Sequence, residues 1–230
     1  MIEVKDIYKK YRKKQVLNGL SLTIEEGKIT CILGINGVGK STTLKAICNL
    51  INIDSGEILI DGEKLNHSVY DKIAFVPDAD NNFSNTTIKE SFEFMKKFYK
   101  NWDDKKAYEM LDMFELTDDL YIDELSKGNK ARVKLIIAFS QNSKYILLDE
   151  PFSGIDIFKR ESFIKAMTRY IDDNQSIIIT THEISEIEAI VDDVYLVDNG
   201  KVILKFNAEE TREIEGKSIL DKIREVYNDK

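Results

Sequence analysis

The chain has 230 residues, enough for one large domain or for one domain that carries a small inserted subdomain. Hydrophobic residues make up 43% and charged residues 32%, a balance typical of an ordinary folded soluble protein. The formal net charge of -8 argues against a partner held mainly by neutralising phosphates, so we expect no nucleic acid partner.

The two cysteines, Cys31 and Cys48, lie in apolar segments without metal-ligand spacing, which indicates reduced core thiols in a cytosolic protein. We find no run of about 18 apolar residues and no apolar signal region at the N-terminus. We therefore expect neither a membrane-spanning segment nor a cleaved signal. At a membrane, such a chain would have to be held by a partner.

The N-terminal part predicts antiparallel strands followed by a strand–loop–helix unit. Residues 2–22 alternate apolar and polar side chains around a turn at Gly19. Residues 29–33 form a short β-branched run that enters a glycine-rich loop, and residues 40–50 have helical character. Residues 56–65 return to a strand pattern.

The remaining chain predicts first helices and then a regular alternation. Between residues 88 and 116, apolar and aromatic side chains recur at helical steps, which indicates two helices, with Asp103 as a candidate N-cap. From Ser126 onward helices and strands alternate, which favours a parallel sheet covered by helices. We expect helices at 126–139, about 158–170, about 183–191 and 209–230, and strands at 145–148 and 177–180.

The predicted fold is therefore α/β, with a parallel sheet core, an N-terminal antiparallel β subdomain and an inserted α-helical subdomain. Only 2 Pro and 11 Gly are present, and no Pro-rich or Ser/Gly-rich stretch indicates a linker. We therefore treat residues 1–230 as one domain. Its expected parts are a core at 1–84 and 141–206, a helical subdomain at about 85–140, and a C-terminal helical tail at 207–230.

Residues 34–41 read GINGVGKS and match the phosphate-loop pattern G-x-x-x-x-G-K-[ST] between a predicted strand and a predicted helix, which indicates a P-loop NTPase core. Glycines let backbone N–H groups point at an anion, and the helix that begins at Gly39 adds its dipole. Lys40 supplies a charge for the β- and γ-phosphates, and the Ser41 hydroxyl is a candidate Mg2+ ligand. The expected ATP-binding residues of this loop are Asn36, Gly37, Gly39, Lys40, Ser41 and Thr42.

A strand that ends in two acids is the candidate second half of the site. Residues 144–151 read KYILLDEP, so four apolar residues form a buried strand, and Asp149 at its end can reach magnesium. Glu150 stands one step further, where it can polarise a water molecule beside the γ-phosphate. Taken alone, this acidic pair fits a catalytic role and a structural role equally well.

Residues 125–133 read LSKGNKARV and resemble the signature sequence of the ATP-binding-cassette (ABC) family, which is more usually Leu-Ser-Gly-Gly-Gln. They precede the Asp149 strand at the family's spacing and open a helix, so Ser126 and the amides near Gly128 form a second anion site. The resemblance implies that this site meets the γ-phosphate on the P-loop of a second cassette subunit, in a dimer around two ATP.

Further segments resemble the family in the same order along the chain. Residues 153–156 resemble the D-loop, which communicates across the dimer. The resemblance implies that His182 is the switch histidine at the γ-phosphate, and that Tyr11 stacks on adenine, with Tyr8 as the alternative. Singly, each has a simpler explanation, as a surface histidine or a strand residue.

Three positions depart from the family's pattern. Asp78 stands where the Q-loop of the family has glutamine, and its shorter, anionic side chain predicts a contact with magnesium. The alternative is that Asp78 only caps the following loop, and Asp80 is then the next candidate. Lys127 and Asn129 replace a glycine and the glutamine of the usual signature.

The resemblance implies a magnesium-dependent ATPase that drives a membrane transporter, with export favoured over import. Such cassettes pair beneath separate membrane-spanning permease subunits, so this chain would lie in the cytoplasm at the inner face of the cell membrane. Permease helices would dock in a groove beside the helical insert. Aromatic residues near that groove, most of them expected in the core, are Phe83, Phe92, Phe94, Phe98, Tyr99 and Trp102. The alternative is a soluble ATPase of the same family that drives a cytosolic assembly, such as iron–sulfur cluster biogenesis.

Overall fold

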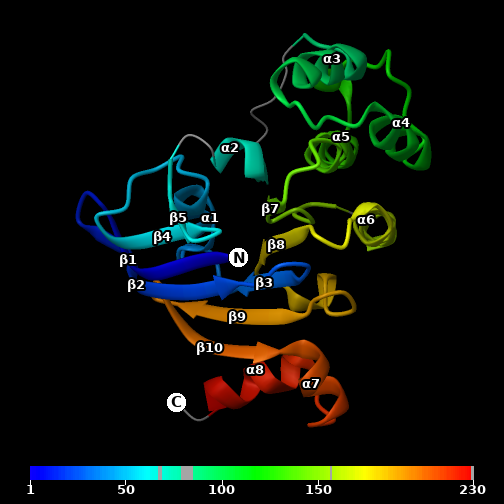
Figure 1. Ribbon diagram of the computed structural model, residues 1–230. Coiled ribbons are helices and arrows are strands. Elements are labelled where there is room, and N and C mark those ends of the chain that lie inside the picture. The colour runs from blue at the N-terminus through cyan, green and yellow to red at the C-terminus, as the bar shows by residue number, and fades with distance from the viewer. Residues whose placement is uncertain (67–68, 79–84, 156, 229–230) are drawn as a thin grey trace.

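The computed structural model describes residues 1–66, 69–78, 85–155 and 157–228, with strands in two sheets and helices around them (Figure 1). The first sheet is antiparallel and has the strand order β2-β1-β4-β5. Its strands are β1 (Ile2–Tyr11), β2 (Lys14–Ile24), β4 (Ser55–Ile60) and β5 (Glu63–Lys64). The alternation over residues 2–22 forms the β1–β2 hairpin, whose pairing runs from Ile2 opposite Ile24 to Tyr11 opposite Lys14. Tyr11 therefore lies at the hairpin tip.

The second sheet has the strand order β10-β9-β3-β8-β7-β6 and carries the predicted parallel core. Neighbouring strands are parallel except for the last pair, in which β10 runs antiparallel to β9. Because the carboxyl ends of β3, β7 and β8 meet at one edge, the segments that follow these strands lie together there. The strands are β3 (Ile29–Leu33), β6 (Ile73–Val76), β7 (Tyr145–Asp149), β8 (Ser176–Thr181), β9 (Asp193–Asp198) and β10 (Lys201–Asn207).

Helices α3, α4 and α5 lie within residues 85–140, the range predicted for the helical insert, and α3 and α4 stand apart from the antiparallel sheet (Figure 1). A capping box of Thr87 and Glu90 begins α3, and Asp103 accepts from Lys106 N at the start of α4, which confirms the N-cap prediction. Trp102 lies between these helices, with its ring 5.6 Å from that of Phe92. The helices up to Tyr170 are α1 (Lys40–Ile47), α2 (Val69–Lys72), α3 (Ile88–Phe98), α4 (Asp104–Met113), α5 (Lys127–Ser140) and α6 (Ile157–Tyr170).

The segment after β8 departs from the prediction. The expected helix at 183–191 is wrong, because only Ile184–Glu186 forms a single 3-10 turn, η2. Ile184, Ile187 and Val191 are buried in the core at nearly helical spacing, which explains the misleading pattern. β-Branched side chains at these positions also disfavour a helix.

The C-terminal part contains elements that the prediction lacked. Strands β9 and β10 form a hairpin around Asn199 and Gly200, both with positive φ, as a two-residue turn requires. The single helix expected at 209–230 is two helices, α7 (Ala208–Glu213) and α8 (Ile219–Asn228). Gly216, with φ 64°, lies in the turn between them.

Alternate residues of the second sheet belong to two buried clusters, one on each face of the sheet. Cys31 belongs to the cluster that packs against α5 and α6, and Cys48 to the cluster beneath the first sheet. Burial raises the pKa of both thiols, which agrees with reduced core cysteines. Among the residues that the structure describes, no helix is long and apolar enough to span a bilayer.

Candidate functional site

The phosphate loop joins β3 to the N-terminus of α1 and makes close backbone contacts that require glycine. Gly39 has φ 116°, and an added Cβ would lie 2.7 Å from Leu17 Cδ2. At Gly34, an added Cβ would lie 2.4 Å from the carbonyl oxygen of Val197. At Gly37, by contrast, an added Cβ would meet no atom within 4 Å, so the loop is open on this side, where a phosphate could approach.

Lys40 is the first residue of α1, and its side chain folds back over the loop. Its Nζ donates to the carbonyl oxygens of Gly34 at 2.7 Å and Ile35 at 3.3 Å. The side chain is only 4% exposed, so its charge acts in a poorly hydrated place. The structure thus holds the ammonium inside the loop, where the sequence predicted the phosphate-binding cation.

Ser41 and Asp149, two predicted magnesium ligands from distant parts of the chain, are in contact. Ser41 Oγ donates to Asp149 Oδ1 at 2.8 Å, and Thr180 Oγ1 donates to the same oxygen at 2.7 Å. Asp149 is buried, so these hydroxyls fix its orientation. Thr180 was not among the predicted site residues, and its signal in the sequence is a hydroxyl residue two positions before the predicted switch histidine.

Glu150 bridges Lys40 and His182. Its Oε1 lies 2.9 Å from Lys40 Nζ, and its Oε2 lies 2.8 Å from His182 Nδ1. The contact with Lys40 is an ion pair without hydrogen-bond geometry, so the buried Oε1 has no hydrogen-bond partner among the described residues. Two further contacts orient Glu150, because its backbone N donates to the carbonyl oxygen and to the hydroxyl of Thr180, both at 3.1 Å.

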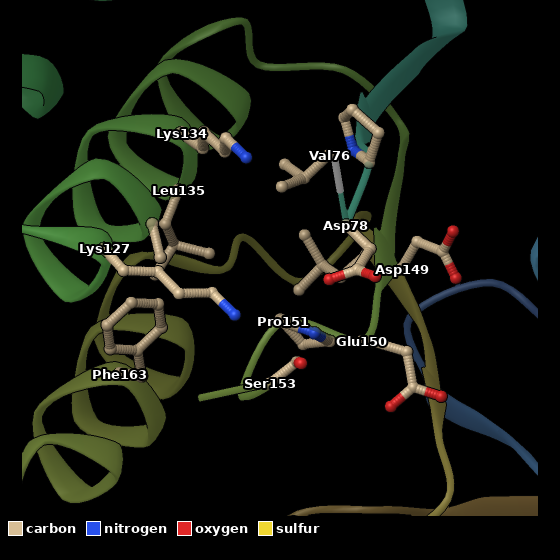
Figure 2. Close-up of a pocket in the computed structure, with 13 residues that line it drawn as sticks. Val76, Asp78, Lys127, Lys134, Leu135, Asp149, Glu150, Pro151, Ser153 and Phe163 are labelled. Atoms are coloured by element: carbon tan, nitrogen blue, oxygen red, sulfur yellow. The ribbon is translucent and has the colours of Figure 1, made fainter. Parts of the chain in front are cut away.

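Asp78 follows β6 and Pro77 and lines a pocket together with Asp149 and Glu150. Figure 2 shows Asp78 and Asp149 close together, with Lys127 reaching toward Ser153 from the other side of the pocket. Asp78 thus lines the same pocket as Asp149, one of the predicted metal ligands, whereas Asp80 lies outside the described residues.

The signature segment lies in the helical part of the molecule, away from the P-loop helix α1 of the same chain (Figure 1). Ser126 is the N-cap of α5, and its Oγ accepts from Asn129 N at 3.3 Å. Ser126 is exposed and Gly128 is half-buried. The stem of Lys127 covers Gly154 of the predicted D-loop, where an added Cβ would lie 2.7 Å from Lys127 Nζ. Asp156, the last D-loop residue, is outside the described residues.

The two candidate adenine-stacking residues both lie on β1. Tyr11 is 44% exposed, at the hairpin tip, and Lys9 Nζ is 5.4 Å from its ring centroid. Tyr8 is packed over Gly19, with its hydroxyl 2.9 Å from the place of an added Cβ. The ring of Tyr11 is therefore the more accessible flat surface. In the phosphate loop, the predicted ATP-binding residues Asn36 and Gly37 are exposed, and Thr42, which follows the loop, is half-buried.

The site's oxygen donors suit a magnesium ion. The described residues contain no group of three or more His, Cys, Asp or Glu side chains that could hold a metal by themselves. A hydroxyl and a carboxylate, Ser41 and Asp149, instead offer two hard oxygen donors beside the phosphate loop. This set fits Mg2+, which keeps water and phosphate oxygens among its ligands rather than a full protein cage.

Comparisons with known proteins agree with this arrangement. A family model described as "ABC transporter" matches residues 17–153. Among curated proteins, the chain is 32% identical to the ABC transporter ATP-binding protein YtrB of Bacillus subtilis, over 93% of this chain and 74% of that protein. It is 31% identical to the petrobactin import ATP-binding protein YclP of Bacillus subtilis, over 98% of this chain and 93% of that protein. It is 30% identical to the lipopolysaccharide export system ATP-binding protein LptB of Haemophilus influenzae, over 88% of this chain and 89% of that protein.

Solved structures give the same result for the fold. The ATP-binding subunit of an ABC transporter superimposes with a TM-score of 0.86 at 25% identity, over 99% of both chains. The dimeric bacterial ABC transporter cassette MJ0796 superimposes with a TM-score of 0.81 at 27% identity, over 90% of this chain and 99% of that one. These matches confirm the predicted fold class. The chain belongs to the ABC transporter family and is similar to its ATP-binding subunits along nearly its whole length.

Proposed function

We propose that this chain is the ATP-hydrolysing subunit of a membrane transporter, which works as a dimer of cassettes around two ATP. One observation carries the proposal, a pair of contact sets at the carboxyl edge of the second sheet. Ser41 contacts Asp149, and Glu150 contacts both Lys40 and His182. Thr180 joins the two sets, because its hydroxyl donates to Asp149 and accepts from the Glu150 amide. A cation for phosphate, two oxygen donors for a metal and a candidate base thus lie together.

In binding ATP, Lys40 would exchange its ion pair with Glu150 for the β- and γ-phosphate oxygens, while the backbone N–H groups of the loop surround them. Ser41 and Asp149 would hold the magnesium ion, with Asp78 beside them. When bound, the ion neutralises charge on the phosphate oxygens. The exposed ring of Tyr11 would stack on adenine.

Glu150 is the proposed general base. Released from Lys40, its carboxylate takes a proton from water as the water oxygen bonds to the γ-phosphorus and the bond to the β-phosphate oxygen breaks, leaving ADP and phosphate. His182 holds Glu150 through Nδ1 and lies at the same edge of the sheet, where its ring can also face the γ-phosphate.

A second cassette is part of the proposal, because helix α5, which begins with Ser126 as its N-cap and Gly128 in its first turn, lies away from the P-loop helix α1 of the same chain (Figure 1). The helix dipole and free amides at the N-terminus of α5 would bind the γ-phosphate on a partner's P-loop. The dimeric cassette found among the similar structures supports this arrangement.

A groove beside the helical insert is the proposed docking place for a permease helix. It has a volume of about 300 Å³ and runs between α2, β6, α3, α5 and the segment that follows α1. Of the predicted aromatics, Tyr99 lines it, Phe92 is in the core, and Phe83 lies outside the described residues. Apolar members of the lining include Leu50, Tyr70, Phe75, Met95 and Tyr99.

We prefer transport to a cytosolic assembly role because this groove is available and because the relatives named above are transporter subunits. The relatives include an import protein and an export protein, so they do not favour either direction. Export stays a prediction from the altered signature sequence.

The Glu150→Gln variant tests the proposal. It keeps the shape of the site but removes the base, so we expect hydrolysis to slow by about a hundredfold or more. Because hydrolysis ends the closed dimer, the variant should elute as a stable dimer with Mg-ATP in size-exclusion chromatography, and the wild type only transiently. A variant that stays monomeric with ATP and hydrolyses it at the normal rate would contradict both the base and the composite site.

A further inference from the structure

A buried ion pair lies behind the switch histidine and joins α6 to the segment that follows β8. Arg160, in the first turn of α6, places Nη2 3.1 Å from Glu186 Oε1. Its Nε also donates to the carbonyl oxygen of Ile155 in the predicted D-loop, at 3.3 Å. The Glu186 side chain is 5% exposed and that of Arg160 is 22% exposed, so the pair is largely shielded from water.

The other oxygen of Glu186 reaches the residue that precedes the switch histidine. Thr181 Oγ1 donates to Glu186 Oε2 at 2.8 Å. The carbonyl oxygen of Thr181 accepts from Gly34 N at 3.3 Å, so this residue also borders the P-loop. His182 follows and contacts Glu150. A continuous set of contacts therefore runs from the D-loop carbonyl to the proposed base.

This ion pair is placed to orient a segment rather than to stabilise the fold. Burial raises the pKa of Glu186, and the hydrogen bond from Thr181 and the charge of Arg160 only partly offset this desolvation. A buried pair of this kind contributes little net stability compared with apolar side chains of similar size. The segment it holds has only the 3-10 turn η2, so no helix fixes the orientation of His182.

We propose that Arg160 and Glu186 are positioning residues for ATP hydrolysis, which orient His182 toward Glu150 and tie that orientation to the D-loop. The inference rests on the proposed function of Glu150 and His182. The D-loop is expected to face the second cassette. A displacement of Ile155 would therefore be transmitted to Thr181 through the side chains of Arg160 and Glu186. Closure of the dimer would in this way set the geometry of the histidine.

The first experiment is a double-mutant cycle with the full-length chain. Glu186→Gln keeps the shape and can still accept from Thr181, but loses the charge that holds Arg160. We expect kcat to fall about tenfold or more, as misplacement of a catalytic group causes, with KM for ATP within about twofold. His182→Ala should also be slow, and the double variant no slower than His182→Ala. Effects that multiply in the double variant would overturn the inference.

The second readout is spectroscopic and independent of turnover. The chain has two histidines, so a His67→Gln background leaves His182 as the one imidazole visible by NMR. We expect Glu186→Gln to shift the ring resonances of His182 in the nucleotide-free protein. Unchanged resonances, together with a wild-type kcat, would show that Glu186 does not position this ring.

Asp193→Asn is the matched control. Asp193 Oδ2 lies 3.2 Å from Lys28 Nζ, its side chain is 7% exposed, and it lies at the opposite end of the sheet. The Asp193→Asn variant should lower the melting temperature about as much as Glu186→Gln does, while leaving kcat and the His182 resonances unchanged. If Glu186→Gln does not fold, Arg160→Lys, which keeps the charge but lacks Nε, takes its place with the same expected results.

Failure of this inference is distinguishable from failure of the proposed function. Glu186→Gln with wild-type turnover and an inactive Glu150→Gln overturns the positioning role alone. Wild-type turnover in Glu150→Gln overturns the proposed function itself, and with it this inference.

Discussion

The backbone of Glu150 lies in the left-handed region, with φ 48°, at the end of a buried strand. Successive side chains of a regular strand point to opposite faces, so Asp149 and Glu150 would diverge if β7 continued. The turn at Glu150 instead directs both carboxylates to the edge that carries the P-loop. Such a conformation costs on the order of 1 kcal/mol or more, and the two hydrogen bonds that the Glu150 amide donates to Thr180 hold it in place.

At Lys40, we expect Lys40→Ala to abolish tight ATP binding, because the variant removes the one side-chain cation that the described part of the phosphate loop supplies. The loss should exceed about tenfold, since a hydrogen bond to a charged group contributes about 1.5–3 kcal/mol. Isothermal titration with ATP measures it.

The ion pair of Lys40 with Glu150 calls for a control, because Lys40→Ala also leaves a buried carboxylate without its partner. Lys40→Ala/Glu150→Gln removes that charge and should regain part of the lost thermal stability. Its ATP affinity should remain low. Affinity close to that of the wild type in either variant would refute the phosphate-binding role of Lys40.

At Asp78, a carboxylate beside the γ-phosphate repels it unless a metal ion lies between them. We therefore expect Asp78→Asn to weaken the dependence of turnover on magnesium concentration, and to leave nucleotide affinity without metal equal or slightly higher. Magnesium titrations of the ATPase rate compare this variant with the wild type and with Asp112→Asn, an exposed aspartate on α4. Superimposable curves would show that Asp78 only caps its loop.

Among the elements, those with a strong local signal could be predicted from the sequence. Strands β3, β7 and β8 are short apolar runs, and α3 and α4 show clear helical spacing, so their positions agree with the prediction within a few residues. The segment after His182 could not be predicted, because its buried residues imitate a helix while long-range packing fixes its course.

The residues of the candidate site also separate into those with a local sequence signal and those brought together only by long-range packing. The P-loop and the Asp149–Glu150 pair have fixed local sequences, so they were predicted. Arg160 and Glu186 are joined by a contact between elements that are distant in sequence, and no spacing rule reveals it. Their roles follow only from the packing of β7, β8 and α6.

The capping box at the start of α3 leads to a prediction at the element scale. Thr87 Oγ1 accepts from Glu90 N at 3.2 Å, and Glu90 Oε2 accepts from Thr87 N at 2.8 Å. Thr87→Ala should therefore lower the free energy of unfolding by about 1 kcal/mol. Urea denaturation measures it, with Thr168→Ala, an exposed threonine inside α6, as the control. Equal losses in both variants would mean that the cap contributes nothing specific.

In the whole molecule, the groove between the core and the helical insert is the surface on which the transporter proposal depends. Leu50, 54% exposed, lies on its rim, and a charge there should prevent an apolar helix from docking. We expect Leu50→Glu to lose co-purification with its permease. Ile214→Glu is the matched control, since Ile214 is 80% exposed and lies between α7 and α8. Loss in both variants, or in neither, would contradict docking at the groove.

Trp102, the single tryptophan of the chain, gives this molecule an optical probe of its own. Its indole Nε1 donates to Asp104 Oδ1 at 2.8 Å, and its ring packs against Phe92, so its fluorescence reports on the helical insert. Cys31 and Cys48 are buried, and burial raises the pKa of both thiols, so neither should react readily with a thiol-specific dye. A cysteine introduced on the first sheet would then take up the dye without competition. Energy transfer between indole and dye would then follow the distance between insert and sheet during a catalytic cycle.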